Sequence, residues 1–164
     1  MVRADERKGP VRLLLRCAEM TIRARASGNR PFDALLADAH GRVLLGQGNV
    51  EVTERMCTGH AEAVLAAEAS RRYPKARLRE CTLYSTAEPC AMCAGAIDWS
   101  GIGRVVHGIS ERRFAELTGG DERNPTLDPP CRTVFAAGRR PIEAPGPFPE
   151  VEAETVAVHA GYGS

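Results

Sequence analysis

The chain has 164 residues, a formal net charge of +1 and 43% apolar residues. At ~100–200 residues per domain, this length predicts one domain over residues 1–164, large enough to fold without disulfides. The balanced charge argues against binding to nucleic acid or anionic membrane through bulk positive charge. Six cysteines are too few for a secreted disulfide scaffold, and no apolar run is long enough for a signal peptide or membrane span. We therefore expect a soluble cytoplasmic protein.

Proline, glycine and apolar residues predict alternating helices and strands. The first helix is expected at residues 10–27, because Pro10 suits a first helical turn and Gly28 the position after the end. A β-hairpin is expected next, with strands at 32–37 and 42–45, before a loop at 46–58. Further helices are expected at 59–72, 89–100, 111–117, 131–137 and 151–159, and further strands at 81–86 and 104–109.

This order predicts an α/β domain in three layers with a mixed sheet, in which the later strands are parallel. Ligands of such sheets bind at the carboxyl ends of strands, where helices begin. Two expected helix starts therefore matter most, Gly59-His60 and Pro89-Cys90.

The chemistry-bearing residues gather at these two helix starts. Cys90 and Cys93 are three residues apart, so both thiols face one side of a helix, in the first turn that stabilises thiolates. His60 supplies a third, neutral ligand, and two cysteines with one histidine are typical of a catalytic zinc site with an open position. Zinc lowers the pKa of its bound water towards ~7, and Glu62 is placed to move that proton to a leaving amine.

Other interpretations of the cysteine pair explain less. A redox pair leaves His60 and Glu62 without a role, and half a zinc ribbon needs a second pair of cysteines. The other four cysteines are isolated in the sequence: Cys17, Cys57, Cys81 and Cys131. A purely structural zinc in a binding module leaves the open fourth position unexplained.

The combination H-x-E followed by P-C-x-x-C is the signature of zinc nucleobase deaminases. From Val11 to Ile109 the chain resembles the cytidine deaminase-like superfamily. Met92 between the cysteines looks like the branch of bacterial guanine deaminases, with tRNA adenosine deaminases nearby. The resembling segments, in family order, are 32–35, 48–49, 58–62, 83–97 and 103–106.

This resemblance implies a three-layer α/β/α sandwich with a mixed five-stranded sheet, and a homodimer. It implies that His60, Cys90 and Cys93 bind Zn²⁺. Glu62 is then the proton shuttle. The implied substrate-binding residues are Phe32, Asn49, Ala61, Glu88, Trp99, Asp121 and Tyr162.

Several of these residues also suit ordinary structural positions. By the resemblance, Phe32 and Trp99 line the base, but a strand phenylalanine and a single tryptophan are equally at home in a core. Asp121 or Glu122 matches an acidic loop residue, which is otherwise a solvated acid. Tyr162 matches an aromatic that closes the site, often from the partner subunit, or belongs to a frayed tail.

The leading functional interpretation is hydrolytic deamination of a free amino-substituted ring, with release of ammonia. A guanine-type base is favoured, with isoguanine and s-triazines such as ammeline as relatives. Adenosine deamination in tRNA is the alternative, kept open by the arginine-rich first helix, and cytosine or cytidine is a third class. Asp33, Cys57 and Gly59 depart from the usual family residues, and residues 119–164 form a variable segment that is expected to complete the pocket.

Overall fold

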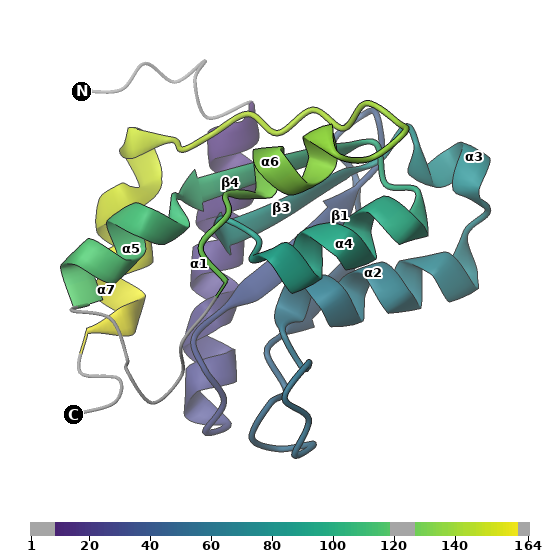
Figure 1. Ribbon diagram of the computed structural model, residues 1–164. Coiled ribbons are helices and arrows are strands. Elements are labelled where there is room, and N and C mark those ends of the chain that lie inside the picture. The colour runs from purple at the N-terminus through teal and green to yellow at the C-terminus, as the bar shows by residue number, and fades with distance from the viewer. Residues whose placement is uncertain (1–8, 119–126, 161–164) are drawn as a thin grey trace.

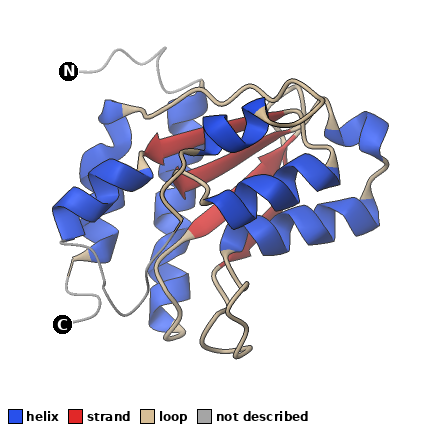
Figure 2. Ribbon diagram, in the orientation of Figure 1, coloured by secondary structure: helices blue, strands red, loops and turns tan. Residues whose placement is uncertain are grey.

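The computed structural model describes residues 9–118 and 127–160 (Figures 1 and 2). The elements in chain order are α1 (Pro10–Ala26), β1 (Asp33–Ala37), β2 (Val43–Gly48), α2 (Ala61–Arg72), α3 (Lys75–Leu78), β3 (Thr82–Ala87), α4 (Ala91–Ser100), β4 (Arg104–Ile109), α5 (Glu111–Thr118), α6 (Cys131–Ala136), η2 (Pro149–Val151) and α7 (Glu152–His159). No helix in this part of the chain combines the length and the apolar character that crossing a bilayer requires.

The strands form one mixed sheet in the order β2-β1-β3-β4. β1 pairs antiparallel with β2, as the hairpin prediction required, and also antiparallel with β3. β3 and β4 are parallel, which confirms the expectation for the later strands, and Leu83 pairs with Val105. The α4 crossover joins these two strands, so the carboxyl end of β3 leads directly into a helix start.

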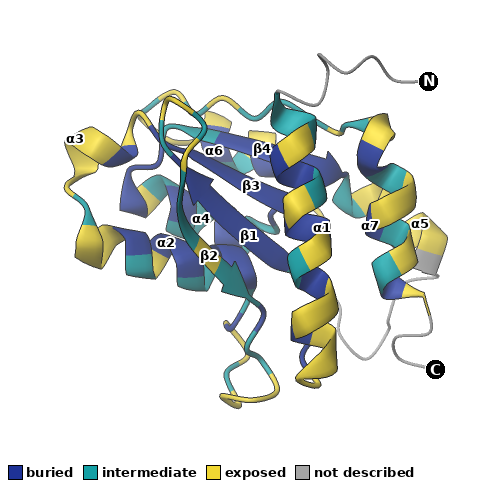
Figure 3. Cartoon of the chain, turned by 180° about the vertical axis from the view of Figure 1, so that it is seen from behind, coloured by how far each residue is buried: buried dark blue, intermediate teal, exposed yellow. Residues whose placement is uncertain are grey.

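Helices cover both faces of the sheet, which confirms the three layers. In Figure 3, α1 and α7 lie in front of the sheet, and α2 and α4 lie behind it. Side chains alternate along β1 because successive residues of a strand point to opposite faces. Leu36 packs into the core on the α2 and α4 side, with Leu65 and Ile97. Leu35 packs on the opposite side, against Leu14 of α1.

The sheet has four strands in the described residues, which corrects the expectation of five. The segment that contains Glu143 runs beside β4 in the place of a fifth strand. The N–H of Val105 donates to the Glu143 carbonyl (2.8 Å), and the N–H of Phe148 donates to the Gly108 carbonyl (2.8 Å). Prolines such as Pro145 have no N–H to donate, so the segment forms isolated bonds rather than a regular ladder.

The predicted helices of the second half are confirmed, including the short α6 and the C-terminal α7. β2 continues to Gly48, three residues beyond the predicted end, and the one-turn α3 after Pro74 was not predicted. The first and last helices of the described chain, α1 and α7, pack side by side. Arg25 of α1 donates a hydrogen bond to the Val158 carbonyl in the last turn of α7 (3.0 Å).

Candidate active site

The two predicted helix starts come together at one end of the sheet. His60 directly precedes α2, Cys90 directly precedes α4, and both have extended backbone angles that end the preceding loop. α2 and α4 pack side by side on the same face of the sheet (Figure 1). Their N-terminal ends therefore meet near the carboxyl end of β3, where the fold class places its ligands.

His60, Cys90 and Cys93 form a group that could hold a metal ion, with all ligand atoms within 4.8 Å of one another. The Nδ1 atom of His60 lies 3.6 Å from each cysteine Sγ. Bonds of about 2.3 Å to sulfur and about 2.0–2.1 Å to nitrogen in a tetrahedron separate these ligands by about 3.6 Å. The observed spacing and the donor set therefore fit zinc.

The pKa values of the two cysteine thiols are shifted in opposite directions. A hydrogen bond from Cys93, with a second from His60, lowers the pKa of the Cys90 thiol to about 4. The hydrogen bond to Cys90, together with burial, raises the pKa of the Cys93 thiol. The hydrogen bond to Cys90 raises the pKa of His60. The site thus stabilises negative charge on the Cys90 sulfur, and a bound cation would be needed to stabilise it on Cys93 as well.

Glu62 lies on the first turn of α2 with its carboxyl beside this group. The residue is 5% exposed. One carboxyl oxygen, Oε2, is 3.6 Å from the Cys93 sulfur, and the other, Oε1, accepts a hydrogen bond from the Ser85 hydroxyl at 2.5 Å. Burial raises the pKa of Glu62, while the hydrogen bond from Ser85 opposes that rise. A buried carboxyl with a raised pKa beside a group of metal ligands is suited to act as a proton acceptor and donor.

Asn49 and Glu51 form the wall of the site that follows β2. The N–H of Asn49 donates to the Phe32 carbonyl (2.9 Å), which fixes the backbone at the end of the strand. The Asn49 side chain donates from Nδ2 to Glu51 Oε2 (2.7 Å), and its Oδ1 accepts from the Glu51 N–H (3.0 Å). The sequence motifs mark Asn49 but not Glu51, because no motif identifies an acid in a loop of irregular structure.

Glu88 is fully engaged by the backbone of later elements. Its Oε1 accepts from the N–H of Cys131 (2.9 Å), and its Oε2 accepts from the N–H of Glu111 (3.2 Å). The family resemblance implies a substrate-binding role for Glu88, which stays a prediction; in the structure its two carboxyl oxygens accept hydrogen bonds from the starts of α5 and α6. Burial, followed by the charges of Cys90 and Glu62, raises the pKa of Glu111 to about 7. Glu111 is thus a carboxyl near the site that sequence analysis did not single out.

The aromatic residues named from the sequence occupy different environments. Phe32 packs against Phe114 of α5 and His159 of α7, with ring centroids 5.5 and 4.8 Å from its own. Trp99 lies in the last turn of α4 and is 78% exposed, so it is a surface side chain of the single chain. Ala61, the first residue of α2, is buried beside Glu62. Asp121, Glu122 and Tyr162 lie outside the described residues.

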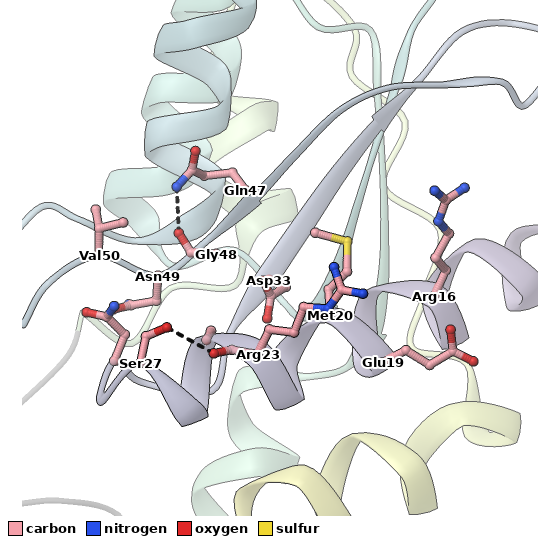
Figure 4. Close-up of a pocket in the computed structure, with 12 residues that line it drawn as sticks. Arg16, Glu19, Met20, Arg23, Ser27, Asp33, Gln47, Gly48, Asn49 and Val50 are labelled. Carbon is pink, nitrogen blue, oxygen red and sulfur yellow. Dashed lines mark hydrogen bonds between the residues drawn. The ribbon is translucent and has the colours of Figure 1, made fainter. Parts of the chain in front are cut away.

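Asp33 faces away from the metal-ligand group. Successive strand residues face opposite sides of the sheet: Ala34 packs into the core on the α2 and α4 side, and Asp33 faces α1. Asp33 lies beside a groove of about 480 Å³ between α1 and β2, whose lining includes Arg16 and Arg23 (Figure 4). Burial raises the pKa of its carboxyl to about 7. Asp33, which departs from the family pattern, therefore lies on the α1 face of the sheet and not on the face that carries His60.

Comparisons with known proteins agree with this geometry. Residues 10–109 match the family model described as the cytidine and deoxycytidylate deaminase zinc-binding region. A probable cytosine deaminase of Schizosaccharomyces pombe is 38% identical over 141 residues, covering 85% of this chain and 83% of the relative. A tRNA-specific adenosine deaminase of Haemophilus influenzae is 37% identical over 100 residues, covering 60% and 57%.

Solved structures show the same fold. A guanine deaminase of Nitrosomonas europaea has a TM-score of 0.62 and 23% identity, and the match covers 97% of this chain and 84% of that one. The relatives are deaminases, which are hydrolases of C–N bonds, and the family model is that of a zinc-binding region. With a family model that covers most of the chain and a relative matched along most of its length, the protein belongs to the cytidine and deoxycytidylate deaminase zinc-binding family.

Proposed function

We propose that this deaminase removes an amino group from a free nucleobase or a related amino-substituted ring and releases ammonia. Guanine-type rings are the leading substrates, with isoguanine and s-triazines such as ammeline in the same class. The observation that carries the proposal is the buried Glu62 carboxyl, 3.6 Å from the sulfur of Cys93. A metal site that only supported the fold would not need a raised-pKa acid beside its ligands.

Each residue of the site has a role in this reaction. His60, Cys90 and Cys93 would hold the zinc, which when bound supplies an activated water at neutral pH. Glu62 accepts a proton at its carboxyl and returns it to the amino group that leaves. Ser85 holds one oxygen of that carboxyl, so that the other is kept toward the ligand group. Asn49 offers its amide to the ring of the substrate.

A free base suits the chain better than a base in tRNA. The S. pombe relative matches 85% of this chain, whereas the H. influenzae tRNA deaminase matches 60%. The longer match includes part of the segment after β4, and it is this segment that packs Phe114 and His159 against Phe32. The net charge of +1 also gives little general attraction for RNA. Cytosine is the second candidate, favoured by the relative named a probable cytosine deaminase.

The test is an ammonia-release panel of guanine, isoguanine, ammeline, cytosine, cytidine and adenosine with the zinc-loaded protein. We expect turnover of a free base, strongest for a guanine-type ring and abolished by removing zinc with a chelator. Turnover of cytosine alone would contradict the guanine-type substrate and support cytosine, the second candidate. Inosine formation in tRNA, with no turnover of any free base, would overturn it.

We also propose that the protein works as a cytoplasmic homodimer, in which residues 119–164 complete the pocket. The exposed Trp99, 78% accessible in the single chain, supports association, because tryptophan is enriched at protein–protein interfaces relative to the rest of the surface. The cysteines are all free thiols, as in a reducing compartment. Light scattering should give twice the chain mass, and Trp99→Glu should shift it to the monomer. A monomeric wild-type mass would contradict the dimer.

A further inference from the structure

Glu51 occupies the space between the Asn49 amide and the His60 ring. Its Oε2 accepts the 2.7 Å hydrogen bond from Asn49 Nδ2 and lies 3.4 Å from Nε of Arg30. Its other oxygen, Oε1, is 3.8 Å from Nε2 of His60. One carboxylate thus contacts the expected base-binding amide, a cation and the far side of an expected metal ligand.

We propose that Glu51 is a positioning residue for both halves of the site. Its negative charge holds His60 in the tautomer that presents Nδ1 to the metal, and its hydrogen bonds fix the orientation of the Asn49 amide. The role toward Asn49 rests on the proposed function, whereas the role toward His60 requires only that the site binds zinc.

The two nitrogens of His60 face different partners. Nδ1 lies 3.6 Å from both cysteine sulfurs, so the metal-facing nitrogen is Nδ1. Nε2 faces Glu51 at 3.8 Å, a distance of electrostatic contact rather than of a hydrogen bond. A carboxylate on that side favours a proton on Nε2 and leaves the Nδ1 lone pair free. Arg30 Nε lies 3.4 Å from the other oxygen of the same carboxylate, so the acid contacts a cation on the side away from His60.

The contact with Asn49 decides which way the amide points. A carboxylate accepts hydrogen bonds but cannot donate them, so it must face the Asn49 NH₂ group and not its oxygen. An asparagine amide has two N–H donors and two acceptor lone pairs. Glu51 takes one donor through its carboxylate and one lone pair through its N–H. One donor and one acceptor remain, which complement a ring edge that carries a carbonyl beside an N–H.

Gly59 allows the Glu51 backbone to lie directly against the residue before His60. A Cβ atom at Gly59 would be 2.9 Å from the Glu51 nitrogen, 3.1 Å from the Glu51 Cα and 2.9 Å from the Met56 carbonyl oxygen. These are backbone atoms, so a side chain there would displace the loop rather than a flexible group. Gly59, a departure from the common alanine, and Glu51 therefore act together: the glycine sets how closely the carboxylate approaches His60.

The decisive experiment measures zinc affinity without substrate, by competition with a chromophoric chelator. Glu51→Gln keeps the size of the side chain and an acceptor for Asn49 but removes the charge. We expect its zinc affinity to fall by about 10–100-fold, the usual effect of losing a partner behind a metal-bound histidine. Glu54→Gln, at an exposed acid of the same loop, is the matched control and should keep wild-type affinity. Equal affinities of the two variants would overturn the role toward His60.

A second variant, Gly59→Ala, tests the contact between Glu51 and His60 without changing the Glu51 side chain. Gly59→Ala should weaken zinc binding because the added methyl pushes Glu51 away from His60. Thermal melting of the metal-free variants separates loss of affinity from loss of fold. If Glu51→Gln does not fold, Gly59→Ala alone decides, and wild-type zinc affinity in that folded variant would overturn the proposal.

The role toward Asn49 is tested by steady-state kinetics on guanine with fully zinc-loaded protein. Glu51→Ala removes the acceptor, so we expect KM to rise by up to about 10-fold, with a smaller change in kcat. Glu51→Gln retains an acceptor and should restore most of the KM. An unchanged KM in Glu51→Ala would remove Asn49 from the proposal. Absence of guanine turnover in the wild type counts against the proposed function, and the zinc measurement is unaffected by it.

Discussion

Glu62 illustrates how a single side chain is prepared for proton transfer by its surroundings. Burial favours the neutral acid, while the hydroxyl of Ser85 favours the carboxylate, so the two effects act in opposite directions on one group. Burial is the larger effect, so the pKa of Glu62 is raised and the neutral acid is favoured more than in an exposed glutamate. Such a group serves as base and acid within one catalytic cycle.

Replacement of Glu62 by glutamine should separate metal binding from turnover. Glutamine keeps an oxygen that accepts from Ser85 but cannot take up a proton. We expect unchanged zinc content by elemental analysis and a loss of kcat of about 10²–10⁴-fold in the ammonia assay. Glu68→Gln, at a half-buried acid of the same helix that pairs with Arg71 and Arg72 away from the metal ligands, is the control. Ammonia release at the wild-type rate by Glu62→Gln would contradict the assigned role.

The site residues that could be predicted from the sequence are those that lie close together along the chain. Cys90 and Cys93 share a helix turn, and His60 and Glu62 share another, so their spacing alone predicts a site. Ser85 was missed because its relation to Glu62 depends on how a strand is registered beneath a helix. This dependence on tertiary contacts is the physical limit of the prediction.

At the scale of elements, Glu88 joins three segments that are distant in the sequence. It follows β3, and its carboxyl oxygens accept the backbone N–H groups at the starts of α5 and α6. Helix starts have unpaired N–H groups and a positive dipole end, so a buried carboxylate is a strong partner for both. The starts of α5 and α6 are therefore attached to the same short loop that carries Cys90 and leads into α4.

We expect Glu88→Gln to loosen α5 and α6. A glutamine has only one acceptor oxygen, so one buried N–H loses its partner, at a cost of about 1–3 kcal/mol in the free energy of unfolding. Hydrogen exchange should quicken over 111–118 and 131–136, and the melting temperature should fall, while zinc content is retained.

Glu80→Gln, at an exposed acid, is the control for this variant. A stable Glu88→Gln protein with unchanged exchange and a raised KM would instead support the substrate-binding role expected from the sequence.

The helices and strands were well predicted from the sequence, because helix starts, strand alternation and the hairpin turn are local signals. The fifth strand was not, because it was expected by family likeness, and the prolines of that segment leave too few N–H donors for a ladder.

At the scale of the whole molecule, two buried histidines make the fold sensitive to acid. His107 lies on β4 with no exposed surface, and neither ring nitrogen has a partner in the described residues. Burial lowers the pKa of His107 to about 4. Burial also lowers the pKa of His159, the last residue of α7, whose ring packs against Phe32, to about 4. Both are neutral in the folded protein at pH 7, and both must gain a charge when the protein unfolds in mild acid.

The direction of the pH dependence follows from this difference. Between about pH 6.5, the ordinary histidine pKa, and about pH 4, the unfolded chain binds more protons than the folded one. The free energy of unfolding therefore falls as the pH falls through this range. Above about pH 6.5 both histidines are neutral in the folded and the unfolded chain, so no stability is lost through them. Urea unfolding at a series of pH values should show this loss.

His107→Leu should flatten that profile, because leucine fills a buried apolar position without a titrating group. We expect stability near the wild-type value at pH 7 and a smaller loss between pH 6.5 and 4, with the remaining slope due to His159 and the carboxyls. His40→Leu, at an exposed histidine of the hairpin turn, should leave the profile unchanged. If His107→Leu lost stability as steeply as the wild type in that range, the folded protein would have to accommodate a charged His107. The buried ring of His107 on β4 would then have gained a hydrogen-bonding partner on protonation.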